Sequence, residues 1–144
     1  MKPKQRSIAR SKTTSVQEAA PQLWHPEVPG PLWNGTRRVR LDQIKAYSRV
    51  LAREFHPLKI ILIGSYAYGH PTRHSDVDLV ILLSSRRQNG GSTAERIRSR
   101  VEAPFPLDLL VWTPQHVAKR LSRDCGFTRE VFSHGKTLYE ARNR

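Results

Sequence analysis

Three aspartates have the spacing to hold a metal ion together. Asp76 and Asp78 stand two residues apart at the head of an apolar run, so in a strand their side chains project to the same face. Two carboxylates that close repel each other unless a cation lies between them. Mg²⁺ prefers hard oxygen ligands and leaves room for waters and phosphate oxygens. The pair therefore predicts a magnesium site.

Asp108 is the third candidate, because it is the only charge within the apolar residues 105–111. A buried carboxylate without a partner is costly, so we expect a neighbour that uses it. If this run pairs with the strand that begins near Asp76, Asp108 completes a site of three carboxylates. Such a site bridges two metal ions, one on an attacking oxygen and one on a triphosphate. We therefore predict that Asp76, Asp78 and Asp108 are both the metal ligands and the catalytic residues.

A glycine-serine turn precedes these carboxylates, and ten residues separate Ser65 from Asp76. The apolar run that ends at Gly64 delivers Ser65 to the edge of the predicted sheet. The turn then exposes backbone N–H groups, and the following helix contributes its positive end. Gly64 and Ser65 are therefore predicted to bind phosphate.

Each of these features has a simpler interpretation when taken alone. An Asp-x-Asp pair is often a solvated strand end, a Gly-Ser turn is common, and Asp108 can be a strand-edge residue that faces solvent. The combination of strand, turn, gap, Asp-x-Asp and a later aspartate in a third apolar run seldom arises by chance. We therefore interpret the set as one site.

The elements that must position this site follow from the hydrophobic pattern. A helix begins at Leu41 with apolar residues three or four apart, and Pro57 ends it. Thr113-Pro114 is a helix start, with a capping hydroxyl before a proline. The predicted strands cover residues 58–63, 77–83, 107–112 and 137–139, the further helices cover 93–101 and 127–133, and 84–92 is a loop. This order predicts an α/β (α+β) fold with a mixed β-sheet of about four strands flanked by helices.

The chain divides into a basic, Pro-rich arm over residues 1–40, expected to be partly disordered, and a domain over residues 41–144. The net charge is +13, and the arm carries +6 of it. This charge favours the binding of polyanions such as nucleotides or nucleic acid. Trp24 and Trp33 make the arm a candidate interface. The apolar runs of the whole chain are too short to span a membrane. Its single cysteine, Cys125, fits a reducing cytoplasm.

The motif Gly64-Ser65-x10-Asp76-x-Asp78 resembles the signature of the DNA polymerase β-like nucleotidyltransferase superfamily. The branch that it resembles is the minimal nucleotidyltransferase (MNT) family, often paired with HEPN-domain toxins in toxin–antitoxin systems. The likeness extends over about residues 41–141, including the segment 106–114 around Asp108 and the closing residues 135–140. Nothing in the first forty residues contributes to it.

The resemblance implies transfer of a nucleoside monophosphate from a triphosphate to an acceptor hydroxyl, with release of pyrophosphate. Gly64 and Ser65 would hold the triphosphate, Asp76 and Asp78 would bind both Mg²⁺ ions, and Asp108 would help to activate the acceptor. ATP is the implied substrate, and a tyrosine of a HEPN-like partner is the implied acceptor. The implied location is cytoplasmic.

One position departs from the family pattern. The family commonly has Arg where this chain has Tyr68, and tyrosine cannot reproduce a bidentate grip on phosphate. Arg73, His70 and His74 in the following loop are alternative phosphate ligands. Tyr66 and Tyr68 are either stacking partners for a base or packing residues. The basic residues Arg96, Arg98 and Arg100 are interpreted as a solvated helix face.

Two other functions remain open at this stage. The chain can be a catalytically weak or inactive nucleotidyltransferase-fold antitoxin that neutralises a partner by contact, which Tyr68 and the tryptophan-bearing arm favour. It can also be a basic nucleic-acid-binding module, although no recognition motif is present and the clustered aspartates would repel phosphate without metal.

Overall fold

A computed structural model describes residues 33–85, 92–123 and 125–142 of this chain. Within these residues, four strands form one mixed sheet in the order β3-β2-β1-β4. The strands are β1 (Lys59–Ile63), β2 (Val77–Leu82), β3 (Leu107–Trp112) and β4 (Lys136–Glu140). β1 is antiparallel to β2 and β4, whereas β2 and β3 are parallel. The fold class predicted from the sequence is confirmed.

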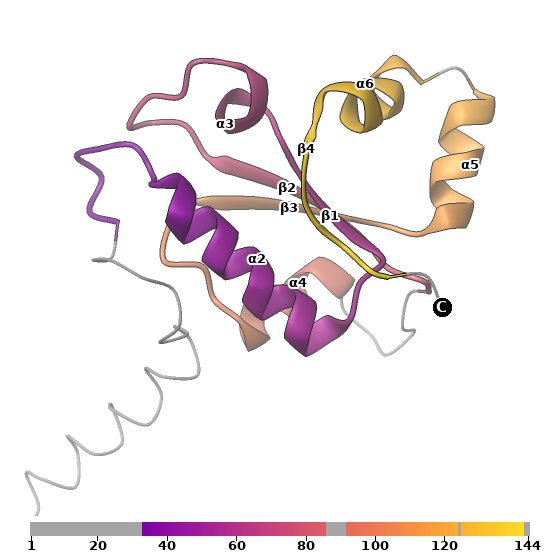
Figure 1. Ribbon diagram of the computed structural model, residues 1–144, viewed down its shortest axis with the longest axis horizontal. Helices are drawn as coiled ribbons and strands as arrows, with labels where there is room; N and C mark the ends of the chain where they lie inside the picture. Colours follow the sequence, from indigo (N-terminus) through magenta and orange to yellow (C-terminus); the bar gives the residue numbers. More distant parts are fainter. Residues whose placement is uncertain (1–32, 86–91, 124, 143–144) are drawn as a thin grey trace, which may run out of the picture.

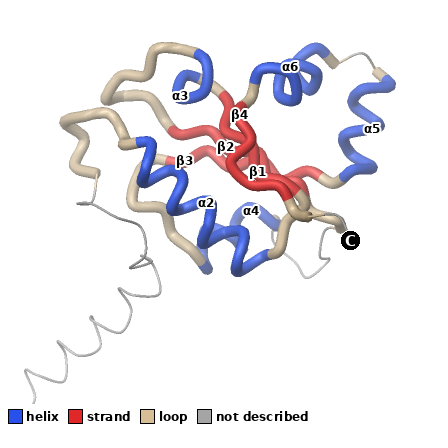
Figure 2. The backbone as a smooth tube through the Cα atoms, in the orientation of Figure 1, coloured by secondary structure: helices blue, strands red, loops and turns tan. Residues whose placement is uncertain are grey.

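Helices lie on both sides of this sheet (Figures 1 and 2). The described helices are α2 (Leu41–Phe55), α3 (Ser65–Tyr68), α4 (Thr93–Arg100), α5 (Pro114–Ser122) and α6 (Gly126–His134). In Figure 1, α2 and α4 lie below the sheet, and α5 and α6 lie above it. The single turn of α3 follows directly from the end of β1.

The face below the sheet carries the main core. Ile60, Leu62, Leu79 and Ile81 alternate along β1 and β2 and pack with the buried side chains of α2, including Ile44, in one cluster. This alternation follows from the two-residue period of a strand. A deep anchor joins α2 to the end of α4, where the hydroxyl of Tyr47 donates to the Val101 carbonyl at 2.7 Å.

The face above the sheet has a smaller core. Ile61, Ile63, Val80 and Trp112 pack with Val131 of α6 in a second cluster. This cluster has fewer residues than the main core, and α5 buries none of its own residues. The part of the face toward the start of β2 and β3 carries the predicted site.

The predicted elements agree with the structure within one or two residues. The strand predicted over 107–112 has these bounds, and the Thr113 hydroxyl accepts from the His116 N–H at 3.1 Å as the capping residue of α5. Residues 1–32 and 86–91 lie outside the described residues, so most of the predicted arm, including Trp24, and much of the predicted 84–92 loop cannot be compared. No helix of the described chain is long and apolar enough to cross a membrane.

Residues 33–40 pack on the domain. The backbone N–H of Trp33 donates to the Pro104 carbonyl at 3.1 Å, and the Trp33 ring lies against the main core. Val39 is buried in that core, and its N–H donates to the Tyr66 hydroxyl at 2.9 Å. These contacts place the chain ahead of α2 beside the turn that follows β1.

Candidate active site

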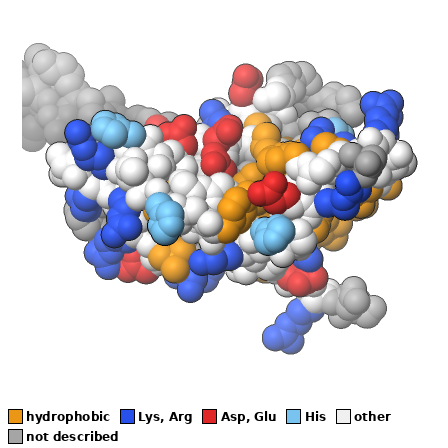
Figure 3. Space-filling model, turned by 90° about the horizontal axis from the view of Figure 1, so that it is seen from above, with side chains coloured by type: hydrophobic (Ala, Val, Ile, Leu, Met, Phe, Trp, Pro, Cys, Tyr) orange, Lys and Arg blue, Asp and Glu red, His pale blue; other side chains and the backbone are white. Residues whose placement is uncertain are grey.

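Asp78 and Asp108 occupy adjacent positions on the face above the sheet, and Asp76 immediately precedes β2. Asp78 and Asp108 are paired in the parallel register of β2 and β3, and Asp78 also faces Ile63 of β1. The strand period gives Asp78 the same face as Val80, and Asp108 the same face as Leu110. Neighbouring strands lie about 4.8 Å apart, so the two carboxylates stand side by side. Figure 3 shows acidic side chains near the middle of this face, beside exposed hydrophobic ones.

Asp78 lies at the centre of this negative charge. Burial raises the pKa of its carboxyl, and the carboxylates of Asp108 and then Asp76 raise it further. All three effects disfavour the charged form, because ionised Asp78 loses water and meets two like charges. A cation at this position would favour the ionised carboxylate and so oppose all three effects.

Gly64 supports Asp78 from the neighbouring strand end. Its φ of 76° lies in the region that favours glycine, and a Cβ at this position would collide with Oδ2 of Asp78. The bare backbone of Gly64 therefore lets the Asp78 carboxylate lie against the turn. The predicted phosphate turn therefore lies directly beside one of the predicted metal ligands, Asp78.

Ser65 begins α3, whose turn is closed by hydrogen bonds to Gly64 and Ser65. The Ala67 N–H donates to the Gly64 carbonyl at 2.9 Å, and the Gly69 N–H donates to the Ser65 carbonyl at 3.1 Å. The first N–H groups of a helix have no partner within the helix. A helix of four residues has a small macrodipole, so α3 would bind a phosphate through the N–H groups at its start and not through its dipole.

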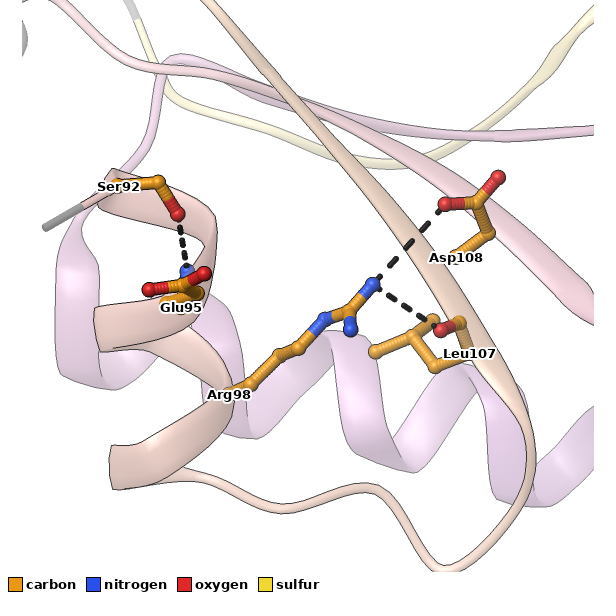
Figure 4. Close-up of polar contacts among 5 residues, drawn as sticks. All are labelled: Ser92, Glu95, Arg98, Leu107 and Asp108. Atoms are coloured by element: carbon orange, nitrogen blue, oxygen red, sulfur yellow. Dashed lines mark hydrogen bonds and ion pairs between the residues drawn. The ribbon is translucent and has the colours of Figure 1, made fainter.

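Asp108 lies at the rim of the site. β3 is an edge strand, and 62% of the Asp108 side chain is exposed. Of the two positions that the sequence left open for Asp108, the structure has the exposed strand edge, because an edge strand exposes a residue that a central strand would bury. Its Oδ1 lies 4.0 Å from Nη2 of Arg98 on α4, which also donates to the Leu107 carbonyl at 3.3 Å (Figure 4).

The donor set fits magnesium by its chemistry. All three candidates offer carboxylate oxygens, the ligands that Mg²⁺ prefers, and the excess negative charge at Asp78 calls for a cation. Among the described residues, however, no three Asp, Glu, His or Cys side chains already surround one point closely enough to hold an ion. Asp76 and Asp108 are both exposed, so their side chains have room to turn inward.

Tyr68, at the position of the family arginine, and the predicted substitutes Arg73, His70 and His74 have different surroundings. Arg73 donates from Nη1 to the Gly35 carbonyl at 3.3 Å and so ties its loop to the segment ahead of α2. Tyr68 is 44% exposed, and its ring meets that of His134 on α6 edge-on, with centroids 6.4 Å apart. His70 and His74 are exposed.

Tyr66 is a packing residue. Its hydroxyl accepts the Val39 N–H, and its ring lies against the main core. The two tyrosines were interpreted either as base-stacking or as packing residues, and in the structure Tyr66 is a packing residue. The exposed ring of Tyr68 has a neighbour but is still open to solvent.

Two features of the surroundings were missed by sequence reasoning. Arg98 is not merely a solvated side chain, because it faces Asp108. A hollow of about 620 Å³ beside α3 is lined by arginines of the segment ahead of α2, together with Tyr66 and Pro71; the arginines are Arg37, Arg38 and Arg40. Neither has a local sequence signal, since both depend on contacts between distant segments.

Comparison with known proteins supports the family resemblance. A family model described as a nucleotidyltransferase domain matches residues 44–126. The match covers more than half of the chain and includes Gly64, Ser65 and all three aspartates. Searches of curated proteins and of solved structures gave no match. The chain therefore belongs to the nucleotidyltransferase domain family.

Proposed function

We propose that this protein transfers a nucleoside monophosphate, preferably AMP from the donor ATP, to an acceptor hydroxyl in a Mg²⁺-dependent reaction. The observation that carries the proposal is the parallel register that places Asp108 next to Asp78, with the bare backbone of Gly64 against the Asp78 carboxylate. Family membership supports nucleotidyl transfer as the reaction class.

Each residue of the site then has a role. Asp76 and Asp78 would hold the metal, which supplies Lewis-acid stabilisation of the charge on the triphosphate. The backbone N–H groups at Ser65 would hold phosphate oxygens, with Tyr68 and Arg73 at the borders of that position. Asp108 would join the metal site and accept the proton of the acceptor hydroxyl. The acceptor oxygen bonds to the α-phosphorus as the bond to the β-phosphate oxygen breaks, and pyrophosphate leaves.

The exposure of Asp108 supports a macromolecular acceptor. Because Asp108 lies on an edge strand and is exposed, a hydroxyl on the surface of another protein could reach it without entering a buried pocket. We propose a HEPN-like partner protein as the source of that hydroxyl, in the cytoplasm, as in toxin–antitoxin pairs of the family that this chain resembles.

An apolar surface on α5 and α6 also supports a protein partner. Three of the large exposed hydrophobic side chains lie here, with exposed fractions of about 40%; they are Leu121, Phe127 and Phe132. Val117, Leu121 and Phe132 line a groove of about 500 Å³. This surface equally fits the alternative function, in which the protein neutralises a partner by contact alone. Nucleic-acid binding by the basic arm stays a prediction.

Transfer of label from α-labelled ATP tests the reaction. The protein, Mg²⁺ and a lysate of the source cell would be incubated together and resolved for labelled protein and RNA. We expect a labelled protein band that Asp76→Asn abolishes, because that change removes ligand charge and keeps the side-chain size. Asp42→Asn is the matched control, since Asp42 is paired with Arg40 at 2.6 Å at the start of α2.

The outcomes separate the functions. A labelled RNA in place of a labelled protein would keep nucleotidyl transfer and reject the protein acceptor. No label from any nucleoside triphosphate, together with capture of a partner by both wild type and Asp76→Asn, would establish contact-only neutralisation. Steep loss of nucleic-acid affinity with salt and no effect of Asp76→Asn would favour the basic binding module.

A further inference from the structure

Within the described part of the chain, Asp108 forms an ion pair with Arg98. The proposed reaction gives Arg98 no role. Its helix is held in a fixed register. The Ser92 hydroxyl accepts the Glu95 N–H at 3.0 Å at the start of α4, and Ile97 is fully buried in the main core. Arg98 follows Ile97, so its side chain leaves α4 beside the edge of the sheet.

The side chain crosses from one face of the sheet toward the other. α4 packs below the sheet, whereas Asp108 belongs to the face above it. Arg98 bridges the two around the outer edge of β3, with the Leu107 carbonyl as a second partner (Figure 4). Because β3 is the edge strand, no further strand blocks this path in the described chain.

Asp108 therefore lies between two positions for positive charge. Arg98 is on its outer side, and the proposed metal position, next to Asp78, is on its inner side. A guanidinium and a divalent cation on one carboxylate repel each other and compete for the same oxygens. In the structure Arg98 lies 4.0 Å from Asp108, and no three ligand side chains of the described residues converge on one point.

We propose that Arg98 is a displaceable counter-charge that holds the Asp108 carboxylate at the outer edge of the sheet until a divalent metal draws it inward. The inference rests on the proposed function, because it takes Asp108 as a metal ligand. Arg98 is thus a positioning residue: it sets where the carboxylate lies and does not touch the reacting atoms.

The contact is suited to release. Its length is 4.0 Å, and the two side chains are 48% and 62% exposed, so water screens the pair. Exposed ion pairs of this kind contribute little, which corresponds to a change of about two- to fivefold in a binding constant. Linkage makes the effect reciprocal, so removing Arg98 strengthens metal binding by the factor by which metal weakens the Arg98 contact.

Mn²⁺ binding, followed by electron paramagnetic resonance of the free ion, tests the proposal without any catalytic readout. We expect Arg98→Gln to bind Mn²⁺ about two- to fivefold more tightly than wild type at low salt, and the difference to shrink in high salt. The matched control is Arg100→Gln on the same helix. Arg100 pairs with Glu54 at 3.4 Å, and we expect this variant to keep wild-type affinity.

A second pair of variants isolates the contact itself. In an Asp108→Asn background, Arg98→Gln should leave Mn²⁺ affinity unchanged, because the carboxylate for which Arg98 and the metal compete is gone. Equal gains in Arg98→Gln and Arg100→Gln would reduce the effect to net charge and overturn the proposal. Weaker binding by Arg98→Gln would also overturn it, since Arg98 would then hold Asp108 in the geometry that the metal needs.

Failure of the inference and failure of the proposed function look different. Wild type that binds Mn²⁺ with the same affinity as Arg98→Gln contradicts the counter-charge and leaves the metal site intact. Absence of Mn²⁺ binding in wild type and Arg98→Gln alike, with and without ATP, contradicts the metal-dependent reaction as well.

Discussion

The two faces of the sheet are built for different purposes. Below the sheet, α2 and α4 complete a core in which Ile44, Leu62, Leu79 and Ile97 are fully buried. Above it, α5 buries none of its own residues, and the face also carries the carboxylates of Asp78 and Asp108. A shared strand supplies both faces: Leu79 points into the core, and Asp78 beside it points into the site.

This difference separates stability from chemistry. Hydrophobic burial on the closed face can stabilise the fold while the open face carries repelling charges that a metal-free protein tolerates. Active sites commonly retain such locally unfavourable groups, because function needs them. Substitutions on the closed face should therefore lower stability most, and those on the open face should mainly change metal binding and transfer.

The largest effect should follow the loss of side-chain volume from the closed face. Ile44→Ala and Leu121→Ala each remove three carbons from a helix, but Ile44 is fully buried, whereas Leu121 is 40% exposed. We expect Ile44→Ala to lower the free energy of unfolding by about 2–5 kcal/mol and Leu121→Ala by less than about 1 kcal/mol. Urea unfolding of both variants measures the contrast, and equal losses would contradict it.

Gly64→Ala should damage the open face and the fold together. The new Cβ would collide with the Asp78 carboxylate at a φ of 76°, so we expect a loss of about 1–3 kcal/mol in unfolding free energy and at least a tenfold loss of Mn²⁺ affinity.

Gly126→Ala is the control for this substitution. A Cβ there meets no atom within 4 Å, so stability should be unchanged or slightly higher. Normal Mn²⁺ affinity in Gly64→Ala would separate the turn from the metal site.

Asp78→Asn should stabilise the metal-free protein while it abolishes transfer. The raised pKa of Asp78 means that the folded state disfavours its charged form, so near pH 7 the ionised group lowers stability. Without divalent metal, we expect the melting temperature to rise by about 1–4 °C. Asp42→Asn should have the opposite sign, because it removes a favourable charge from the first turn of α2. A fall in melting temperature for Asp78→Asn would show that its charge is already compensated.

The smallest effect on fold and activity concerns Cys125 at the start of α6. Hydrogen bonds from Thr128, first from its side chain, and the nearby Arg120 guanidinium lower the pKa of the thiol to about 7. The thiolate is the nucleophile, so the rate of alkylation by iodoacetamide should rise through pH 7. Thr128→Val, which removes the hydroxyl and keeps the volume, should move this midpoint upward. An unchanged midpoint would exclude the Thr128 hydroxyl as the cause.

The sequence by itself determined the local elements. Apolar runs of five or six residues, the Thr113-Pro114 helix start and the two-residue strand period are local properties, and the structure agrees with them. The family match was also accessible, because Gly64-Ser65 and Asp-x-Asp are contiguous motifs at a fixed separation.

Only the tertiary structure decided how these elements combine. It placed β3 at the edge of the sheet, which exposes Asp108 and opens the path for Arg98. It also brought Gly64 against Asp78, and Trp33 against the Pro104 carbonyl. Each of these contacts joins residues of different elements, ten or more positions apart along the chain. Strand order and helix placement establish them, and no local pattern of residue types encodes either one.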